Sequence, residues 1–418
     1  MSRSTALDDY RWLCGDEGAR WLSEARLQAE TQTSPLAAAN LLQRHLPPDR
    51  ARLVLEQAHL RSRAASKFAA AERMFFTARG LEQSSDETIA AYKAARFPVD
   101  LAVADLCAGI GGDLIALAAR GPALGVERDP VVALLAFENL RRCGVATRGN
   151  SCICVGDVGS GLIADGVTLH LDPDRRPNAR RTTHLEAHDP PQEVIERLVG
   201  RAPGVAIKLA PATRVTDTWS GQFEREWISR DGVCRQQVVW CGELAQQAGR
   251  RAATVVLSKG NKNPGTCTIS ASAHDALIVA AAQRIASYLF DPDPAVLAAD
   301  LLATLAAQLA LQPVDPQSVY LTGDAAVLHP MVSSFEVLET MPFRPPAVRR
   351  WLAEKGLRVR EIKTRGCGVD PDKLRPQLST RDGKPCTLFV LRQARKVIAV
   401  ATRRLTTRDA PHDGPAAL

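Results

Sequence analysis

The feature that most constrains this chain is an apolar segment that runs directly into a glycine-rich turn. Residues 102–113 read Ala-Val-Ala-Asp-Leu-Cys-Ala-Gly-Ile-Gly-Gly-Asp, and the next residues continue in an apolar helical pattern. Glycine adopts positive φ without strain and lets a ligand approach the backbone, and a helix N-terminus attracts polar ligand groups. The segment therefore predicts a strand, a turn and a helix of a Rossmann-like α/β sheet.

Three later apolar runs each end in a carboxylate. They end at Glu127, Asp157 and Asp172, and Glu127 follows Gly109 by 18 positions. In an open parallel sheet, ligands bind at the carboxyl ends of the strands, and an acidic residue at this spacing accepts hydrogen bonds from ribose hydroxyls. The turn alone fits a dinucleotide, S-adenosylmethionine or no ligand, but the series of strand ends indicates a nucleotide site.

This series of motifs resembles the class I S-adenosylmethionine-dependent methyltransferases, over residues from about 77 to 260. Asp105 precedes the turn, where a carboxylate would repel a pyrophosphate but not a zwitterionic amino acid. The resemblance implies that Asp105, Gly109 and Gly111 hold the methionine end of the cofactor, that Glu127 binds its ribose and that Asp157 binds its adenine. The other cofactor-binding candidates at these strand ends are Cys107, Ala108, Gly112, Asp113, Arg128 and Val158. The alternative is a Rossmann-like domain that binds no nucleotide.

A predicted helix stands just before the first strand, and Ser85 or Asp86 can cap it. Trimethylguanosine synthases and related RNA methyltransferases carry a similar capped helix, which covers the cofactor. The resemblance gives four site candidates: Thr77, Arg79, Glu82 and Gln83. The first and last of these are assigned to the cofactor. The alternative for each is a capping loop that touches no ligand.

The acceptor motif is expected at residues 172–176, which read Asp-Pro-Asp-Arg-Arg. Amino methyltransferases have Asp or Asn, two prolines and an aromatic residue there, so that the acid accepts a hydrogen bond from the amine. Here Asp174 replaces the second proline and Arg175 replaces the aromatic residue. The arginines fit a phosphate or can stack on a base. The catalytic candidates are Asp172, Arg175, Arg176 and Lys208.

Lys208 lies in an otherwise apolar run, residues 204–211, which predicts the fifth strand. It either points into the site as a charge on the substrate or is a salt-bridged structural lysine. Methyl transfer from a sulfonium needs an aligned nucleophile and no metal. The ten cysteines include no Cys-x-x-Cys pair, so we expect neither a zinc site nor a disulfide framework. Cys152 and Cys154 are interpreted as filling a strand.

Charge is unevenly distributed along the chain. Residues 340–404 contain 17 Lys and Arg against 5 Asp and Glu, a balance of +12, whereas the whole chain carries +7, which leaves −5 on the rest. A separate basic module of this kind is typical of proteins that bind a polyanion. Six basic residues would supply the contacts: Arg349, Arg350, Arg358, Arg360, Lys363 and Arg365. The alternative is a surface that is merely well solvated.

The basic module has an α+β pattern. We expect strands over 335–341 and 358–364, helices over 347–355 and 371–378, and a closing hairpin from two strands within 387–402. The pattern, from about residue 317 to 405, resembles the THUMP-like domain attached to a family of bacterial methyltransferases. True THUMP domains bind RNA, so the resemblance implies RNA as the partner.

The remaining segments complete the expected organisation. We expect an N-terminal helical region over 1–95, a methyltransferase domain with a seven-stranded sheet over 96–290, a connecting helix and linker over 291–315, the THUMP-like domain over 316–405 and a disordered tail over 406–418. Within them, apolar spacing predicts helices over 51–59, 64–75 and roughly 293–311. Antiparallel strands over 224–229 and 251–257 would close the sheet, with Trp240 in its core.

No apolar run approaches the roughly 20 residues that span a bilayer, and the N-terminus lacks a secretory pattern. The sequence therefore predicts a cytoplasmic bacterial enzyme that uses S-adenosyl-L-methionine to methylate an RNA base, in tRNA or rRNA. Two alternatives remain open. One is methylation of a small molecule or protein, and the other is a non-catalytic RNA-binding protein that retains the cofactor pocket. The oligomeric state does not follow from the sequence.

Overall fold

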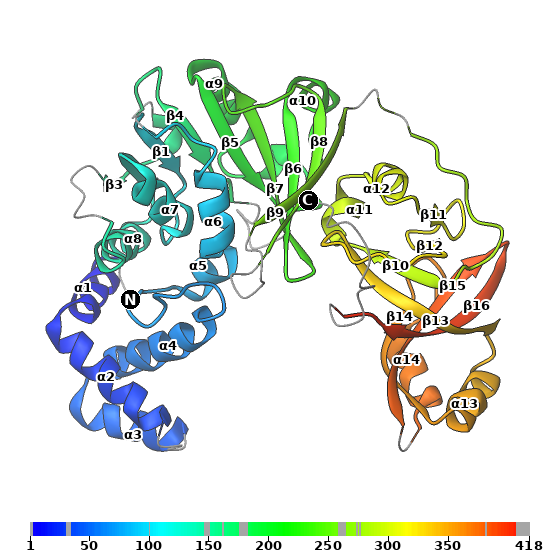
Figure 1. The fold of residues 1–418 in the computed structure, drawn as a ribbon. Helices are drawn as coiled ribbons and strands as arrows, with labels where there is room; N and C mark the ends of the chain where they lie inside the picture. Colours follow the sequence, from blue (N-terminus) through cyan, green and yellow to red (C-terminus); the bar gives the residue numbers. More distant parts are fainter. Residues whose placement is uncertain are drawn as a thin grey trace. The chain divides into compact units, whose positions relative to one another are not determined.

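The structure, a computed structural model, describes residues 3–30, 35–99, 101–145, 151–160, 163–174, 183–257, 265–272, 275, 277–380 and 383–406 (Figure 1). The chain divides into two compact units. Unit 1 comprises residues 1–224 and 237–248, and unit 2 comprises residues 225–236 and 249–418. The division therefore does not follow the boundaries at 290 and 315 expected from the sequence.

The first sheet has the Rossmann-like strand order expected from the sequence. Its strands follow the order β3-β2-β1-β4-β5-β7-β6-β8-β9. The first five are β1 (Val103–Leu106), β2 (Ala123–Glu127), β3 (Ser151–Val155), β4 (Thr168–Leu171) and β5 (Gly204–Leu209). These five pair in parallel, so the carboxylates that follow them gather at one edge of the sheet.

The sheet is wider than the seven strands expected, because two further strands extend it. The closing strands are β6 (Glu224–Arg230), β7 (Val233–Gly242), β8 (Arg250–Val256) and β9 (Thr266–Ser272). The strand antiparallel to β5 is β7, which contains the buried Trp240, whereas β8 pairs in parallel with β6. The antiparallel pairing expected for 251–257 is therefore found only against β9, because β8 pairs in parallel with β6. The parallel pairing with β6 follows from the turn Asp231-Gly232, where both residues have positive φ. The turn lets the chain reverse tightly after β6, so that β7 lies between β5 and β6 and β8 pairs with the other edge of β6.

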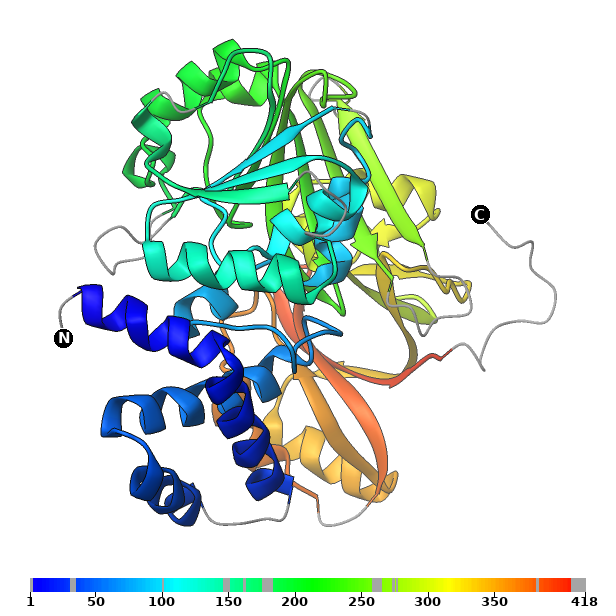
Figure 2. The same cartoon turned by 90° about the vertical axis from the view of Figure 1, so that its left-hand side faces the viewer.

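Helices pack against the strands of unit 1 (Figure 2). They include α7 (Gly112–Arg120), α8 (Pro130–Arg142), α9 (Gln192–Arg201) and α10 (Asp217–Gln222). A buried cluster that includes Leu106, Leu171 and Ile207 joins the strands to α9 and α10 through Ile195 and Trp219. Cys152 and Cys154 are exposed, since β3 is the edge strand, so they do not fill the sheet as interpreted.

The N-terminal region is helical up to residue 64. It contains α1 (Arg3–Cys14), α2 (Asp16–Glu30), α3 (Pro35–His45) and α4 (Pro48–Ala64), followed later by α5 (Ala78–Gln83) and α6 (Glu87–Ala94). The helix expected over 64–75 is absent, and the chain forms turns there instead. Side-chain amides replace the helical hydrogen bonds, since Gln57 exchanges two with Phe76 and Asn139 exchanges two with Phe75.

Unit 2 contains a second sheet of seven strands, in the order β11-β12-β10-β13-β16-β15-β14. Its C-terminal part is β13 (Val332–Pro342), α13 (Pro345–Glu354), β14 (Leu357–Lys363), α14 (Pro371–Leu374) with a 3₁₀ turn (Arg375–Leu378), β15 (Lys384–Gln393) and β16 (Lys396–Arg404). Every strand and helix predicted for the basic module is confirmed. The hairpin β15–β16 turns at Ala394 and Arg395, which both have positive φ.

The expected connecting segment is an integral part of unit 2. It contains β10 (Tyr288–Pro292), α11 (Pro294–Ala298), α12 (Leu302–Gln308), β11 (Gln312–Pro313) and β12 (Leu321–Gly323). Asp293 caps α11 as predicted, but the single long helix is broken where Asp300 takes a φ of 56°. The strand β10 pairs with β13, so these residues belong to the second sheet. Among the described residues, no helix is long and apolar enough to cross a membrane.

Candidate cofactor and acceptor site

The glycine turn follows β1 and leads into α7. Cys107, Gly109 and Gly111 have φ values of 62°, 56° and 86°, so the backbone coils back on itself before Gly111 caps the helix. A Cβ built on Gly109 would have no atom within 4 Å, whereas one on Gly111 would lie 3.5 Å from Ala136. The turn is therefore open at Gly109 and packed at Gly111, as a cradle for a ligand beside Gly109 requires.

Glu127 is held rigidly at the end of β2. Its Oε2 accepts a hydrogen bond from Gly109 N at 3.0 Å, and its Oε1 accepts one from Asp129 N at 3.0 Å. The carboxylate thus ties the glycine turn to the next strand end. Arg128 forms an ion pair with Asp189. Ala108 donates its N–H to the carbonyl of Val126 at 3.0 Å, which also joins the turn to β2.

The end of β3 is exposed. Asp157 accepts a hydrogen bond from Gly159 N at 2.7 Å, and Val158 begins a 3₁₀ turn (Val158–Ser160). Both residues lie two or three positions beyond β3, next to the strand that carries Glu127. Of the five cofactor residues taken from the resemblance, Gly109 and Glu127 are joined directly, while Asp157 lies one strand further along the same edge.

A buried charge cluster lies beneath the turn. Asp105 is paired in register with His170 on β4, and its Oδ1 lies 2.6 Å from Nδ1 of that imidazole. Asp113, in the first turn of α7, forms an ion pair with Lys93 of α6 at 2.7 Å and accepts a hydrogen bond from Ser85 Oγ at 2.8 Å. All five side chains are buried. Buried charges of this kind persist only when they are paired, which explains why the residues converge.

Asp113 is the most strongly stabilised carboxylate of the cluster. Burial by itself would raise the pKa of Asp113, but the adjacent Lys93 ammonium overcomes this and holds the pKa well below its usual range. The sequence assigned Asp113 to the cofactor, whereas the structure occupies both of its oxygens within the protein. Asp113 therefore helps to hold the glycine turn in place through contacts in the protein interior.

Lys208 connects the cluster to the acceptor motif. Its Nζ lies 2.6 Å from Oδ2 of Asp172, 2.9 Å from the carbonyl oxygen of Gln83 and 3.7 Å from Oδ2 of Asp113. Burial would lower the pKa of Lys208, but Asp172 and Asp113 raise it instead. The two interpretations of Lys208 are thus combined, because it is a salt-bridged lysine whose main partner is a catalytic candidate.

The acceptor motif is clamped by α5. Asp174 forms an ion pair with Arg79, and its Oδ1 accepts a hydrogen bond from Gln83 Nε2 at 3.1 Å. Thr77 caps this helix by accepting a hydrogen bond from Gly80 N at 2.9 Å. The helix therefore reaches the site through Arg79 and Gln83. Arg175 and Arg176 lie outside the described residues.

Comparisons with known proteins establish the family. A methyltransferase of Mycobacterium tuberculosis described as S-adenosylmethionine-dependent is 32% identical over 359 residues, which covers 82% of this chain and 93% of that protein. The chain belongs to the S-adenosylmethionine-dependent methyltransferases. A crystal structure of a candidate methyltransferase from Porphyromonas gingivalis W83 has the same fold, with a TM-score of 0.75 and 19% identity over 93% of this chain and 99% of that one.

Two family models match parts of this methyltransferase. Residues 332–404 match the THUMP domain-like family, which confirms the predicted C-terminal module, and residues 6–64 match a domain of unknown function that corresponds to α1–α4. The chain is thus an enzyme that uses S-adenosyl-L-methionine, with a THUMP-like module after its catalytic fold. Among the described residues, no group of three or more His, Cys, Asp and Glu is arranged to hold a metal ion.

The residues of unit 1 fit the cofactor of this methyltransferase family. The Oδ2 atom of Asp105 is buried and accepts no hydrogen bond from the described residues, so it is available to an ammonium group. The space beside Gly109 and the fixed carboxylate of Glu127 suit the ribose side of the ligand. Asp105 thus offers an unused acceptor and Gly109 offers open space. Glu127 already accepts two hydrogen bonds, but it is only partly buried and its carboxylate can accept further ones.

Sequence reasoning missed Lys93 and His170. Lys93 is 1% exposed near the end of a short helix that mixes polar and apolar residues, and a lysine there gave no sign that it would be buried. The signal for His170 was available, because it interrupts an apolar strand whose neighbours are all buried. Of the proposed caps, Asp86 caps α6 by accepting from Thr88 N and Ile89 N, which frees Ser85 to bind Asp113.

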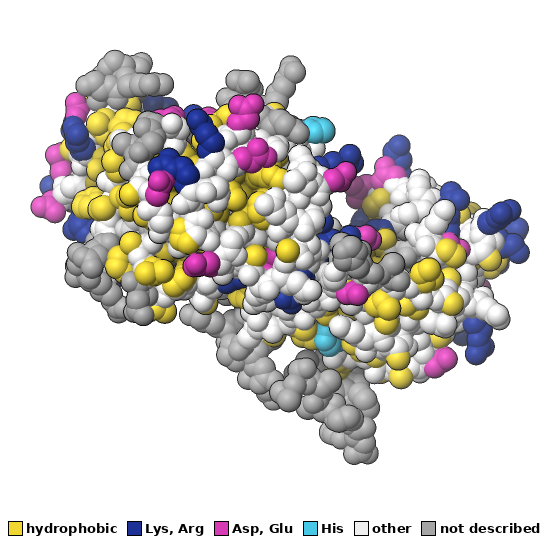
Figure 3. Space-filling model, turned by 90° about the horizontal axis from the view of Figure 1, so that it is seen from above, with side chains coloured by type: hydrophobic (Ala, Val, Ile, Leu, Met, Phe, Trp, Pro, Cys, Tyr) yellow, Lys and Arg dark blue, Asp and Glu magenta, His cyan; other side chains and the backbone are white. Residues whose placement is uncertain are grey.

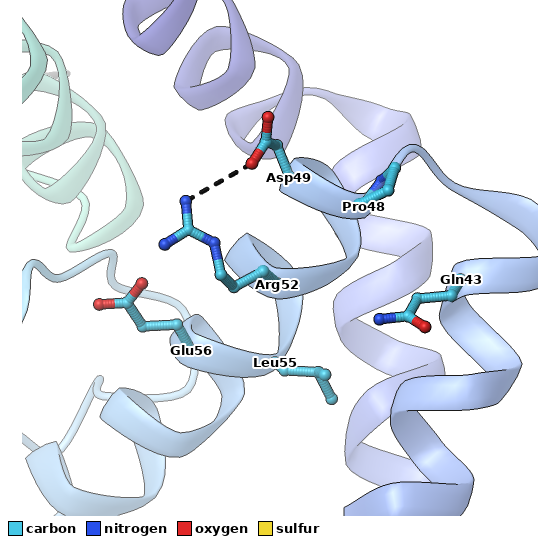
Figure 4. A pocket seen from close by; sticks show the side chains of 6 residues that line it. All are labelled: Gln43, Pro48, Asp49, Arg52, Leu55 and Glu56. Atoms are coloured by element: carbon cyan, nitrogen blue, oxygen red, sulfur yellow. Dashed lines mark ion pairs between the residues drawn. The ribbon is translucent and has the colours of Figure 1, made fainter. Parts of the chain in front are cut away.

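A hollow of about 530 Å³ lies elsewhere in unit 1, between α3 and α4 (Figure 4). It is lined by Gln43, Pro48, Asp49, Arg52, Leu55 and Glu56. Asp49 and Arg52 form an ion pair with each other at 3.6 Å across adjacent turns of one helix. The hollow contains none of the strand ends, glycines or buried acceptors of the methyltransferase site, so its size alone does not make it the cofactor pocket.

Proposed function

We propose that this methyltransferase transfers a methyl group to a base of RNA, in tRNA or rRNA, and that its THUMP-like module captures the substrate. The observation that carries the proposal is the combination of Asp172 beside the glycine turn with a strongly basic module in the same chain. Residues 340–404 have a charge balance of +12. A module of this charge favours a polyanionic partner over a small metabolite.

The cofactor would supply a methyl group bound to a sulfonium sulfur. Asp105 would bind its ammonium, Glu127 its ribose and Asp157 its adenine. The backbone N–H of Asp172 donates to the carbonyl oxygen of Leu106 at 3.2 Å, which holds the acceptor motif against the start of the turn. This places the Asp172 carboxylate close to the methionine end of the proposed cofactor site, as an in-line transfer requires.

Asp172 would orient the acceptor. Its side chain is 31% exposed, so a substrate group can reach the carboxylate, while Lys208 occupies Oδ2. The other oxygen can accept a hydrogen bond from an amine of the acceptor and direct its lone pair to the methyl group. Lys208 fixes the direction of the Asp172 carboxylate through the 2.6 Å contact with Oδ2, and so acts as a positioning residue.

Besides Arg350, whose side chain is 77% exposed and lies 3.9 Å from Glu354, three of the six predicted RNA contacts are well exposed in unit 2. Arg358 and Arg360 lie two positions apart on β14, with their exposed side chains on one face of the strand, and Arg349 is exposed on α13. Figure 3 shows Lys and Arg side chains projecting from several places on the face in view, some of them beside Asp and Glu side chains. By contrast, Lys363 and Arg365 are ion-paired with Asp291 at 2.8 and 2.9 Å. The first three would therefore be the stronger phosphate contacts.

The test is a transfer reaction. The full-length protein is incubated with cofactor that carries a labelled methyl group and, separately, with RNA, protein and metabolite fractions from cells that lack the gene. We expect label in the RNA fraction, none in RNA from cells that express the gene, and none with an Asp172→Ala variant. Label confined to protein or metabolites would refute the RNA substrate and favour the second acceptor class.

A further inference from the structure

Two buried residues next to the proposed cofactor site take no part in the mechanism described so far. Lys93, on α6, and His170, on β4, are each 1% exposed. Their side chains meet, with 3.2 Å between Lys93 Nζ and His170 Nε2. Burying a lysine and a histidine lowers the stability of a protein unless each has a hydrogen-bonding or charged partner, so the placement of this pair calls for an explanation.

The contacts fix where the protons of this pair lie. Lys93 Nζ lies 2.7 Å from Oδ1 of Asp113. Burial lowers the pKa of Lys93, but the Asp113 carboxylate opposes this and favours the ammonium form. An ammonium has only donors, so Nε2 of His170 must accept. The imidazole is then neutral, with its proton on Nδ1, and it donates that proton to Oδ1 of Asp105 at 2.6 Å.

Asp105 is left with one unused oxygen. Its Oδ2 is buried and has no hydrogen-bond partner among the described residues. The other charged groups around it are already engaged, because Lys93 binds Asp113 and Lys208 binds Asp172. With His170 neutral, the three carboxylates outnumber the two ammonium groups by one. The cluster therefore carries a net charge of one negative unit, and Asp105 is the carboxylate at which a ligand can neutralise it.

We propose that Lys93 and His170 are positioning residues that hold Asp105 ionised, with Oδ2 directed to the α-ammonium of the cofactor. The inference rests on the cofactor site of the proposed function but does not depend on the nature of the acceptor. It also makes α6, which carries Lys93, part of the cofactor-binding machinery without a contact to the ligand.

The electrostatics of Asp105 support this role. Burial raises the pKa of Asp105, and the electrostatic attraction of His170, together with its hydrogen bond, opposes that rise. Asp113 and Asp172, the other carboxylates that face it, also raise the pKa. Without His170, Asp105 would take up a proton more readily, and a protonated carboxyl cannot pair with an ammonium. Affinity for the cofactor would then depend on pH in a range where the native protein is insensitive.

The experiment measures cofactor affinity by calorimetry from pH 6 to pH 8.5, with full-length protein and no acceptor. In His170→Asn the side-chain amide can still donate to Asp105, whereas in His170→Leu it cannot. We expect affinity within about 3-fold of the native value for the Asn variant, and a loss of roughly 10- to 100-fold at pH 6 for the Leu variant, as for loss of a hydrogen bond to a charged group. The Leu variant should recover affinity as pH rises and Asp105 ionises.

A second variant keeps the test decisive if His170→Leu does not fold. Lys93→Met removes the donor that fixes the His170 ring, so the hydrogen bond to Asp105 weakens and the rise in the pKa of Asp105 is opposed less. Its cofactor affinity should therefore fall more steeply than that of the native protein as pH decreases. S-adenosylhomocysteine has the same ammonium, so it should lose affinity by the same factor in each variant.

Three results would overturn the inference. These are native affinity at every pH in His170→Leu, equal losses without pH dependence in both His170 variants, or a Lys93→Met variant with the native pH profile. Glu127→Ala separates this failure from failure of the site itself. If Glu127→Ala weakens binding while the other variants do not, only the role of Lys93 and His170 is refuted. If it too binds normally, the cofactor site is wrong.

Discussion

The charged residues of the cofactor site and those of the THUMP-like module differ in how deeply they are buried and how closely they are paired. Lys93 and Lys208 have side chains that are 2% and 10% exposed, and each is held by a carboxylate within 2.7 Å. The side chain of Arg350 on α13 is 77% exposed, and its partner Glu354 lies 3.9 Å away. Buried charges fix positions and are costly to unpair, whereas exposed charges act at long range and are screened by salt. One unit is thus suited to aligning atoms and the other to attracting a polyanion.

Removing one charge from each region gives the largest expected contrast. Lys208→Met leaves Asp172 and part of Asp113 without a buried partner, so we expect a loss of about 3 kcal/mol in the free energy of unfolding. Arg350→Met should cost less than about 0.5 kcal/mol, because an exposed pair contributes little. Urea unfolding of the two variants measures the difference. Equal losses would show that burial does not distinguish the two regions.

Glu127→Ala separates binding from stability within unit 1. The variant removes two hydrogen bonds to a carboxylate and the proposed ribose contact, so we expect the cofactor to bind roughly 100-fold more weakly. Asp165→Ala is a matched control, because Asp165 pairs with Arg201 on an exposed surface. Calorimetric titration with S-adenosyl-L-methionine measures both. Unchanged affinity in the Glu127 variant would contradict the assignment of the pocket.

Acid titration compares a buried carboxylate with a more exposed one. The pKa of Asp113 is lowered, as burial is outweighed by Lys93, and the pKa of Glu361 is lowered because Lys363 and Arg404 outweigh its partial burial. A lowered pKa contributes stability above the unfolded value, and this is lost as pH falls through the folded value. The loss of unfolding free energy on acidification below about pH 4 should therefore shrink in Asp113→Asn. It should change much less in Glu361→Gln, and the reverse order would break the comparison.

The smallest single effects are expected on the basic surface. Arg358→Ala and Arg360→Ala should each weaken RNA binding by the full-length protein about 3-fold and lower the slope of affinity against salt. Lys363→Met is the matched control, since that lysine is already engaged by Asp291 and Glu361. Filter binding at several salt concentrations measures all three. If RNA affinity does not change with salt concentration, the basic surface does not bind phosphates and is only a well-solvated surface.

Local sequence signals predicted much of this fold because they act over short distances. The ends of β2, β4 and β5 and every element of the basic module follow from apolar runs bounded by turn residues. The turn at Asp231-Gly232 was equally local, but it was overlooked, and the strand β7 that follows it was missed as well. The non-helical conformation of residues 65–76 could not be predicted from local sequence, because Gln57 and Asn139 supply hydrogen bonds to this stretch from other helices.

The candidate site likewise contains residues that local sequence signals predict and residues that only the packing reveals. Gly109, Glu127 and Asp172 stand at strand ends, so a parallel sheet brings them together without further information. The contact between Lys93 and His170 joins residues 77 positions apart, and only the packing of α6 reveals it. Sequence patterns therefore identify groups that topology gathers at an edge. They do not identify the buried partners that set the charge of those groups.

The most direct test of the account is nucleoside mass spectrometry on RNA from cells whose chromosomal copy carries Asp172→Ala. The account predicts that one methylated nucleoside present in native cells disappears from this RNA and from RNA of cells without the gene. The same nucleoside should persist in cells that carry the surface variant Asp165→Ala, whose carboxylate pairs with Arg201 on an exposed surface. RNA modification that is identical in all four strains would contradict the central claim.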